Sequence, residues 1–272
     1  MRRRAKRSLG QNFLVDPNLQ RKLAAAVGAV PGEPVLEIGP GQGALTGHLV
    51  ESGAVVTAVE LDDELAAGLA ARYEDHPRVA IVHGDILSVD FAAVTADWGR
   101  TRVAGNIPYN ITTPIIFRLL RLPYPADIVL TVQAEVAARI LAGPGTRTYG
   151  ALSVGVAVHA RVSRVCKVPR RAFRPVPRVE SVAIRITPLS PPRLTAEEAE
   201  RVRILTRAAF SWRRKQMGTI LRRHPELRCP VAAVEEVLGA RGLSPRVRPE
   251  RLSPEDYVEL GAALLAKPGP HV

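Results

Sequence analysis

PVLEIGPGQG, residues 34–43, decides the fold of this 272-residue chain. The first five residues are mostly apolar and predict a buried strand, and the three glycines predict a tight loop that runs into a helix over residues 44–52. The same alternation continues on both sides of this stretch. Further strands are expected over residues 55–61, 79–83, 101–104 and 128–132, and further helices over residues 19–27, 64–73, 114–120 and 135–141. This alternation predicts an α/β fold with a doubly wound, Rossmann-like sheet covered by helices on both faces.

The chain is expected to divide near residue 190. Before that point, residues 152–160 and 181–187 are rich in β-branched side chains and are expected to pair as antiparallel strands at the edge of the sheet. After the prolines at 191 and 192, a capping box at Thr195 and a second helix start at Ser253-Pro254 predict further helices. Residues 16–190 are therefore expected to form the Rossmann-like domain, and residues 191–272 a small helical domain.

The glycine-rich loop indicates which cofactor the sheet holds. Gly39 and Gly41 allow the backbone to turn tightly and to approach a ligand closely. The spacing is G-x-G-x-G, whereas nicotinamide enzymes use G-x-G-x-x-G, so a dehydrogenase is a distant alternative. Glu37 precedes the loop, where its carboxylate can face the cationic methionine part of S-adenosyl-L-methionine. The loop is therefore interpreted as a site for that cofactor.

Acidic residues at the ends of the next two strands support this interpretation. Glu60 ends the second strand, about 20 residues after the loop, where an acid accepts hydrogen bonds from ribose hydroxyls. Asp85 ends the third strand and is placed for the adenine amino group of the cofactor, although an aspartate after a glycine is also a common loop former. Leu61 and Ile86, which follow these acids, are included in the predicted cofactor site.

Asn106-Ile107-Pro108-Tyr109 follows a short apolar run and is expected to lie in the loop after a strand. An aromatic amino group is a poor nucleophile, because its lone pair is delocalised into the ring. An enzyme that methylates it must accept its hydrogen bonds and hold the base flat. Asn106 offers an amide oxygen, Pro108 stiffens the turn and frees the preceding carbonyl, and Tyr109 offers a face on which an extruded base can stack. A turn with an asparagine cap is the simpler alternative.

The net charge of +12 is unevenly distributed. Basic residues concentrate in residues 1–22, 161–185 and 190–272, whereas the remainder is net acidic. Such segregation is typical of nucleic-acid-binding proteins. Cys166 and Cys229 have no metal-like spacing, so reduced thiols and no metal site are expected. Since no apolar run is long enough for a signal peptide or a membrane span, the protein is expected to be cytoplasmic.

With these motifs, the chain resembles the KsgA/RsmA family of ribosomal RNA adenine N6,N6-dimethyltransferases over residues 5–265. Its cofactor motifs are similar to residues 37–43, 59–62 and 84–85, and its catalytic motif to residues 105–111. Further similar stretches are residues 8–14, 142–144 with 149–154, 173–181 and the basic helix at 209–215. Ala134 and Arg178 stand where the family commonly has lysine, and Arg178 keeps the charge.

The resemblance implies that Phe173 and Tyr109 sandwich the target adenine. It implies contacts with the cofactor from Asn12, Leu14, Gly39, Glu60, Asp85 and Asn106. The basic arm, residues 1–15, is expected to close over the cofactor site. Expected RNA contacts are Arg170, Arg171, Arg174, Arg178, Arg213, Arg214, Lys215, Arg222 and Arg223. The implied substrate is a pair of adjacent adenosines in a hairpin near the 3′ end of 16S rRNA, and the chain is expected to be a monomer.

Two other functions remain open. A 23S rRNA adenine N6-methyltransferase of the macrolide-resistance type shares the Asn106 motif and the Phe173 element. Against it stand the glycine-rich loop, residues 149–154 and the basic helix of the tail. The second alternative is a ribosome-assembly factor whose binding to the subunit outweighs its chemistry.

Overall fold

The structure is a computed structural model that describes Lys6 and residues 10–265. These residues form two compact units. The first contains the chain up to Ala137 and the segment Val162–Pro188, and the second contains Ala138–Arg161 and the chain from Leu189 onward. The expected basic arm, residues 1–15, therefore lies partly outside the described residues.

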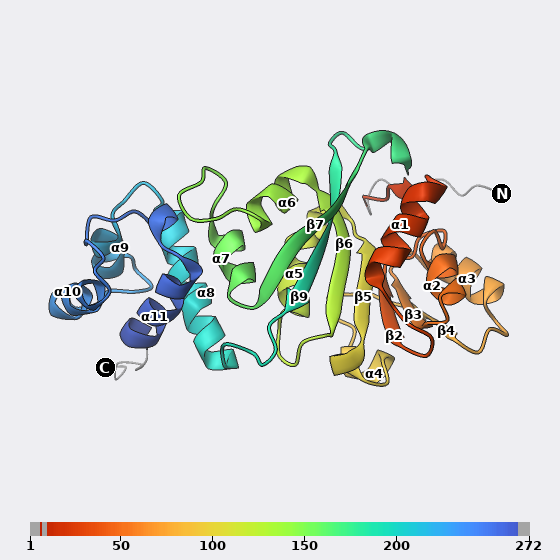
Figure 1. The fold of residues 1–272 in the computed structure, drawn as a ribbon, viewed down its shortest axis with the longest axis horizontal. Helices are drawn as coiled ribbons and strands as arrows, with labels where there is room; N and C mark the ends of the chain where they lie inside the picture. The colour runs from red at the N-terminus through yellow and green to blue at the C-terminus, as the bar shows by residue number, and fades with distance from the viewer. Residues whose placement is uncertain (1–5, 7–9, 266–272) are drawn as a thin grey trace. The chain divides into compact units, whose positions relative to one another are not determined.

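A seven-stranded sheet organises the first unit (Figure 1). Its strands are β2 (Pro34–Ile38), β3 (Val55–Glu60), β4 (Val79–His83), β5 (Arg102–Asn106), β6 (Asp127–Gln133), β7 (Ala160–Val168) and β9 (Ser181–Pro188). The strand order is β4-β3-β2-β5-β6-β9-β7. β2 pairs in parallel with β3 and β5, β3 with β4, and β5 with β6, whereas β9 is antiparallel to β6. The predicted α/β fold with a doubly wound sheet is confirmed.

The helices of this unit follow the expected alternation. α1 (Pro17–Val27) begins after Asp16, whose carboxylate accepts hydrogen bonds from the N–H groups of Asn18 and Leu19 at 2.9 and 3.1 Å. The other helices are α2 (Thr46–Glu51), α3 (Asp63–Arg72), α4 (Phe91–Val94), α5 (Thr112–Leu119) and α6 (Ala134–Ile140), the last of which runs into the second unit. α1 contacts β5 and β6, and α3 contacts β3 and β4, so the helices pack against the sheet.

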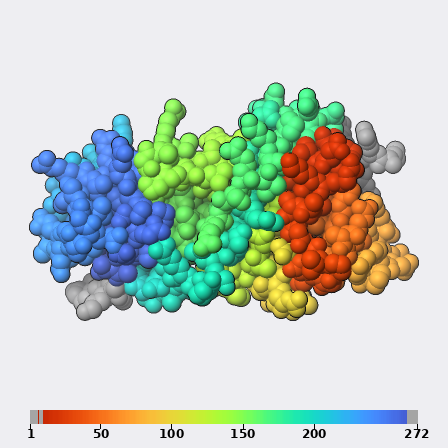
Figure 2. Space-filling view, viewed as in Figure 1, coloured from red at the N-terminus to blue at the C-terminus, as the bar shows by residue number. Residues whose placement is uncertain are grey.

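A second, two-stranded sheet fixes the N-terminal segment. β1 (Phe13–Leu14) pairs antiparallel with β8 (Phe173–Arg174), with Leu14 opposite Phe173. Figure 2 shows the red surface of α1 against the green surface of the chain near β8. One hydrophobic core joins α1, the sheet and β8, and its buried members include Leu14, Leu23, Val27, Val35, Val56, Val129 and Phe173.

The order of the strands reverses between β2 and β5, in the middle of the sheet. At such a point the connections leave in opposite directions, and a crevice opens beyond the carboxyl ends of the two strands. Gly105 permits the two strands to pair closely here, because a Cβ at this position would lie 2.8 Å from the carbonyl oxygen of Ile38. The sheet therefore provides a ligand-binding crevice beside the end of β5.

The prediction of a strand over residues 152–160 was wrong. These residues form helix α7 (Ala151–Ala157), and the edge strand next to β9 is β7. The helix starts where the Ser153 hydroxyl accepts a hydrogen bond from the Gly150 N–H at 3.0 Å. An apolar run that is buried on most sides has no period to distinguish a helix from a strand, and the buried residues here are Leu152, Ser153, Val154 and Val156.

Residues 138–161 also depart from the expected domain division, because they belong to the second unit. Tyr149 is buried in the core of that unit, and its hydroxyl donates a hydrogen bond to the carbonyl of Leu252 at 2.9 Å. The helices predicted to start after Thr195 and Ser253 are confirmed. The helices of this unit after α7 are α8 (Ala196–Ser211), α9 (Met217–Arg223), α10 (Val231–Ala240) and α11 (Pro254–Leu265).

Candidate active site

A cavity of about 290 Å³ lies in the first unit, at the carboxyl ends of β2, β3 and β5. The N-terminal segment, residues 10–15, supplies part of its wall. The predicted site residues that line it are Asn12, Leu14, Glu37, Gly39, Gly41, Glu60, Asn106, Pro108 and Tyr109. The structure thus brings together most of the predicted cofactor residues and three of the four predicted catalytic residues.

The glycine-rich loop forms the floor of the cavity. Gly39 and Gly41 have φ angles of 63° and 61°, a conformation that glycine adopts without strain. A Cβ at Gly39 would meet nothing within 4 Å, so this part of the loop faces open space. A Cβ at Gly41 would lie 3.0 Å from the ring of Phe13. Glycine at position 41 therefore allows the N-terminal segment to pack on the loop.

Glu60 is held in a fixed orientation at the end of β3. Its carboxylate accepts hydrogen bonds from the N–H groups of Gly41 at 2.9 Å and of Asp62 at 3.0 Å. The residue is only 6% exposed. Each carboxylate oxygen keeps a further lone pair, so the two backbone contacts orient the group without exhausting it as an acceptor for a ligand hydroxyl.

Glu37 is a buried acid one residue before the end of β2. It is 1% exposed, and its carboxylate accepts a hydrogen bond of 2.6 Å from the Thr46 hydroxyl. Burial raises the pKa of Glu37 to about 7, the Thr46 hydrogen bond opposes this rise, and the nearby charge of Glu60 adds to it. A cationic ligand in the cavity would favour the ionised carboxylate, as expected for the methionine part of the cofactor.

We therefore expect the affinity for S-adenosylmethionine to depend on pH through Glu37. The folded-state pKa lies near 7, so the carboxylate is mostly protonated at pH 6 and mostly ionised at pH 8. If the cation binds the ionised form, the dissociation constant should fall roughly tenfold from pH 6 to pH 8 and level off above it. Isothermal titration at several pH values measures this dependence.

Glu37→Gln should remove the pH dependence and bind no better than the wild type does at pH 6. Its side chain keeps an oxygen for the Thr46 hydrogen bond. Glu74→Gln, at an exposed glutamate, is the matched control and should keep the wild-type profile. A Glu37→Gln protein with the wild-type profile would show that another group titrates.

Asn106 is the last residue of β5, opposite Thr131 of β6, whereas the sequence placed it in the following loop. The strand extends because Gly105 lets the ladder with β2 continue past Ala104. The Asn106 amide nitrogen donates a hydrogen bond to the carbonyl of Asn12 at 2.8 Å. Its amide oxygen is therefore the atom left to accept a hydrogen bond from a substrate amino group in the cavity.

Tyr109 lies in the turn just after β5 and lines the cavity. Its hydroxyl shares a hydrogen bond of 2.7 Å with the hydroxyl of Ser181, at the start of β9. Burial raises the pKa of Tyr109, and the Ser181 hydrogen bond opposes this rise. The tyrosine therefore remains a neutral ring in a fixed position, suited to stacking rather than to proton transfer.

Phe173 does not line the cavity. Its side chain is fully buried in the core of the first unit, opposite Leu14 across the β1–β8 pair. The expected sandwich of a base between Tyr109 and Phe173 is thus not preformed. The reason is that β8 and β1 pair and turn the Phe173 ring into the hydrophobic core.

Leu61, Asp85 and Ile86 also lie outside the cavity wall. Leu61 is 47% exposed, whereas Ile86 is buried. The Asp85 carboxylate accepts a hydrogen bond from the N–H of Leu87 at 2.9 Å, which is the loop-forming contact considered above. Their predicted roles require a ligand that extends past Glu60 to the ends of β3 and β4.

Sequence reasoning missed several wall residues. Gln11 and Phe13 belong to residues 8–14, which resemble a stretch of the family. Their neighbours Asn12 and Leu14 were predicted to contact the cofactor, and this could have indicated that Gln11 and Phe13 lie at the site too. Leu45 lies just before α2 and Leu65 lies in α3, and nothing in the sequence separates either apolar residue from ordinary core positions. All four line the cavity.

The predicted RNA-binding residues fall into one group in each unit. In the first unit, the exposed residues Arg170, Arg171, Arg174 and Arg178 all lie between the end of β7 and the start of β9. In the second unit, Arg214, Lys215, Arg222 and Arg223 are exposed near the end of α8 and on α9. Arg213 differs from them, because it is half-buried. Its guanidinium donates a hydrogen bond to the carbonyl of Arg147 at 2.9 Å.

Comparison with known proteins settles the family. The family model for ribosomal RNA adenine dimethylase matches residues 2–239. The chain belongs to the ribosomal RNA adenine dimethylase family. As a member of this family it is an S-adenosylmethionine-dependent methyltransferase of adenine in ribosomal RNA, as the sequence predicted.

Related proteins align with this dimethylase over nearly its whole length. A protein of Geobacter sulfurreducens named ribosomal RNA small subunit methyltransferase A is 40% identical over 269 residues, which cover 98% of this chain and 97% of the relative. The protein of that name from Pseudomonas aeruginosa is 38% identical over 267 residues, with coverages of 98% and 97%.

Two solved structures resemble this dimethylase. A dimethyladenosine transferase from Plasmodium falciparum has a TM-score of 0.79 at 27% identity, covering 91% of this chain and 95% of that one. The 23S rRNA methyltransferase ErmE has a TM-score of 0.71 at 28% identity, covering 93% and 99%.

The cavity of this dimethylase fits S-adenosylmethionine. Gly39 leaves open space above the loop, Glu37 offers a carboxylate to a cation, and Glu60 offers acceptors to hydroxyls. Within the described part of the chain, no three histidines, cysteines or acids are grouped so as to hold a metal ion. Among the described residues, no helix has the length and apolarity needed to cross a membrane.

Proposed function

We propose that the protein adds two methyl groups to the N6 amino group of each of two adjacent adenosines, in a hairpin near the 3′ end of 16S rRNA. The orientation of Asn106 carries the chemical part of this proposal, methylation of an amino group, because its amide oxygen is left to accept a hydrogen bond beside the cofactor cavity. The names of the relatives favour the small subunit. We infer further that the protein acts as a monomer in the cytoplasm during small-subunit biogenesis.

The proposed mechanism relies on positioning. S-adenosylmethionine supplies the electrophilic methyl group. The Asn106 amide oxygen and the carbonyl that precedes Pro108 would accept the hydrogens of the adenine amino group. They would hold its nitrogen in line to displace the methyl group from the sulfonium sulfur, which would leave as a neutral thioether. Once methylated, the nitrogen is cationic and loses its proton readily to water, so no strong base is needed. Alignment and electrostatics then supply most of the rate.

The target base must leave its stack to reach this site, which costs least in an unpaired loop. Tyr109 offers its ring face at the cavity wall, held by the hydrogen bond to Ser181. We propose that Phe173 completes the sandwich when the segment around β8 shifts and uncovers its ring. The exposed arginines after β7 would contact the phosphates of the hairpin in this arrangement.

Methyl transfer from labelled S-adenosylmethionine to small and large ribosomal subunits lacking the modification tests the proposal. Digestion of the RNA to nucleosides should show dimethyladenosine from the small subunit. Label confined to the large subunit would instead assign the macrolide-resistance type of activity. Tight binding to the small subunit without label would favour the assembly-factor role.

A further inference from the structure

The buried carboxylate of Asp62 lies beside the cavity and has no part in the mechanism above. Asp62 follows the end of β3, and its side chain is 3% exposed. It accepts hydrogen bonds from the N–H groups of Glu64 at 3.1 Å and Leu65 at 3.3 Å, which caps α3. Its own N–H donates to the Glu60 carboxylate. The capping contacts alone would explain an aspartate at this position, but its carboxylate accepts two further hydrogen bonds.

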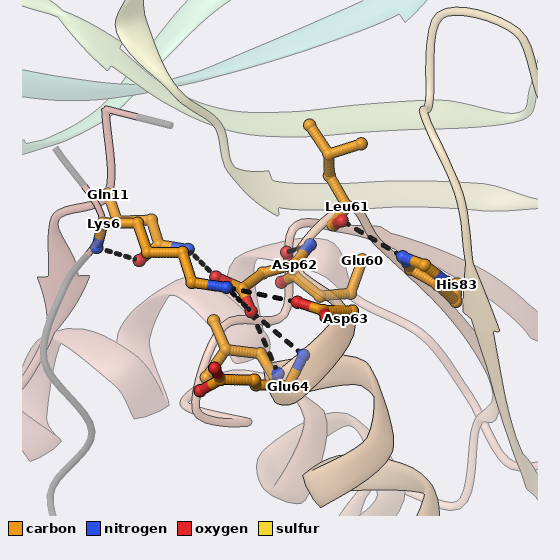
Figure 3. A network of polar contacts seen from close by, with 9 residues as sticks. Lys6, Gln11, Glu60, Leu61, Asp62, Asp63, Glu64 and His83 are labelled. Atoms are coloured by element: carbon orange, nitrogen blue, oxygen red, sulfur yellow. Dashed lines mark hydrogen bonds and ion pairs between the residues drawn. The ribbon is translucent and has the colours of Figure 1, made fainter. Parts of the chain in front are cut away.

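These contacts come from the N-terminal segment (Figure 3). The Gln11 amide nitrogen donates to Asp62 Oδ2 at 2.9 Å, and the Lys6 ammonium donates to Asp62 Oδ1 at 3.1 Å. Gln11 also accepts a hydrogen bond of 2.7 Å from the backbone N–H of Lys6, so the donors form one network. Burial acts to raise the pKa of Asp62, but the hydrogen bonds from Gln11, Lys6 and Leu65 outweigh it and hold the pKa low.

A single residue, Asn12, links this network to the side-chain amide of Asn106. Gln11 is followed by Asn12, whose carbonyl accepts the hydrogen bond from Asn106. The segment is also anchored further along, where β1 pairs with β8. Between these anchors, residues 10–14 line the cavity. Asp62 thus anchors the N-terminal end of this wall segment, and the pairing of β1 with β8 anchors its other end.

We propose that Asp62 is a positioning residue that holds residues 10–14 closed over the cofactor cavity through Gln11 and Lys6. It thereby slows cofactor release and keeps the Asn12 carbonyl against Asn106. This inference rests on the assignment of the cavity to S-adenosylmethionine, and it does not depend on which RNA is methylated.

Asp62→Asn separates this role from helix capping. Asparagine caps a helix as well as aspartate does, so α3 should keep its start and the melting temperature should stay near that of the wild type. The new amide nitrogen faces the Gln11 donor, and the charge that attracts Lys6 is lost. The dissociation constant for S-adenosylmethionine should rise about tenfold, mostly through faster dissociation.

The double variant Asp62→Asn/Gln11→Glu reverses the hydrogen bond, because a carboxylate at position 11 accepts from the asparagine amide and attracts Lys6. It should restore affinity to within about threefold of the wild type. Asp63→Asn is the matched control: Asp63 pairs with Lys6 at 3.1 Å, but its side chain is 73% exposed. This control should bind within about twofold of the wild type.

Hydrogen exchange without cofactor provides a second measurement. The amides of residues 10–14 should exchange faster in Asp62→Asn and recover in the double variant. Wild-type affinity in Asp62→Asn, or a double variant that stays as weak as the single one, would overturn the proposal. The variant Glu60→Gln shows whether a negative result contradicts the assignment of the cavity or only the role of Asp62. If it weakens cofactor binding while Asp62→Asn does not, the cavity assignment stands and the role of Asp62 fails; if neither variant changes binding, both fail.

Discussion

Asn106→Ala should lower kcat by about three orders of magnitude while leaving the affinity for ribosomal RNA within about threefold of the wild type. The amide oxygen is proposed to accept a hydrogen bond that strengthens as the amino nitrogen attacks, so its loss affects the transition state more than binding. Single-turnover methyl transfer at saturating RNA measures the rate, and filter binding measures the affinity.

The alanine variant also loses the hydrogen bond to the carbonyl of Asn12, which is part of the cofactor wall. The affinity for S-adenosylmethionine must therefore be measured separately, and turnover compared at saturating cofactor. Asn110→Ala is the matched control, because Asn110 is exposed in the same turn. Should Asn106→Ala keep turnover within tenfold of the wild type, the proposed mechanism is wrong.

Removing the charges of Arg214 and Lys215 should instead weaken RNA binding and leave kcat nearly unchanged. Both side chains are exposed after the end of α8 and are predicted to bind phosphates. Arg214→Gln/Lys215→Gln should weaken RNA binding about tenfold near physiological salt and reduce the slope of log affinity against log salt by roughly 1.5. The kcat at saturating RNA should change less than about twofold, because neither residue belongs to the unit that holds the cavity.

Arg213 is a poor choice for this experiment, although the sequence predicts it as an RNA contact. Its guanidinium donates to the Arg147 carbonyl and lies 6.0 Å from the centre of the Phe210 ring, so replacement would disturb the second unit. Arg121→Gln, at an exposed arginine outside the predicted surface, is the control for a general loss of charge. An unchanged salt slope in the double variant, with a changed slope in the control, would place the RNA surface elsewhere.

Local patterns were sufficient to predict the parallel part of the sheet. The predicted bounds of β2 and β4 match the structure, since glycines and polar residues stop each apolar run sharply. The same reasoning failed for α7, where buried residues follow one another without a period. It also missed β7, whose exposed residues include Arg161, Arg164 and Lys167, so that its sequence resembles a basic surface segment.

The candidate site was predictable where its residues end strands, because parallel strands end at a common edge. Glu37, Glu60 and Asn106 meet at the cavity for this reason. The burial of Phe173 was not predictable, because it depends on pairing with Leu14, far away in the sequence. The contacts of Asp62 with the N-terminal segment likewise join residues more than fifty positions apart, and no local spacing encodes them.

The buried acid near the end of β2 makes cofactor binding a proton-coupled event. Near neutral pH about half of the Glu37 side chains carry a proton, because their pKa is about 7. Binding of a cation should expel these protons into the solvent, and the heat of binding should then vary with the ionisation enthalpy of the buffer. The demethylated form of the cofactor has lost the sulfonium charge, so its binding should release fewer protons from Glu37. A calorimetric series in two buffers would thus report the charge state of the bound molecule without following catalysis.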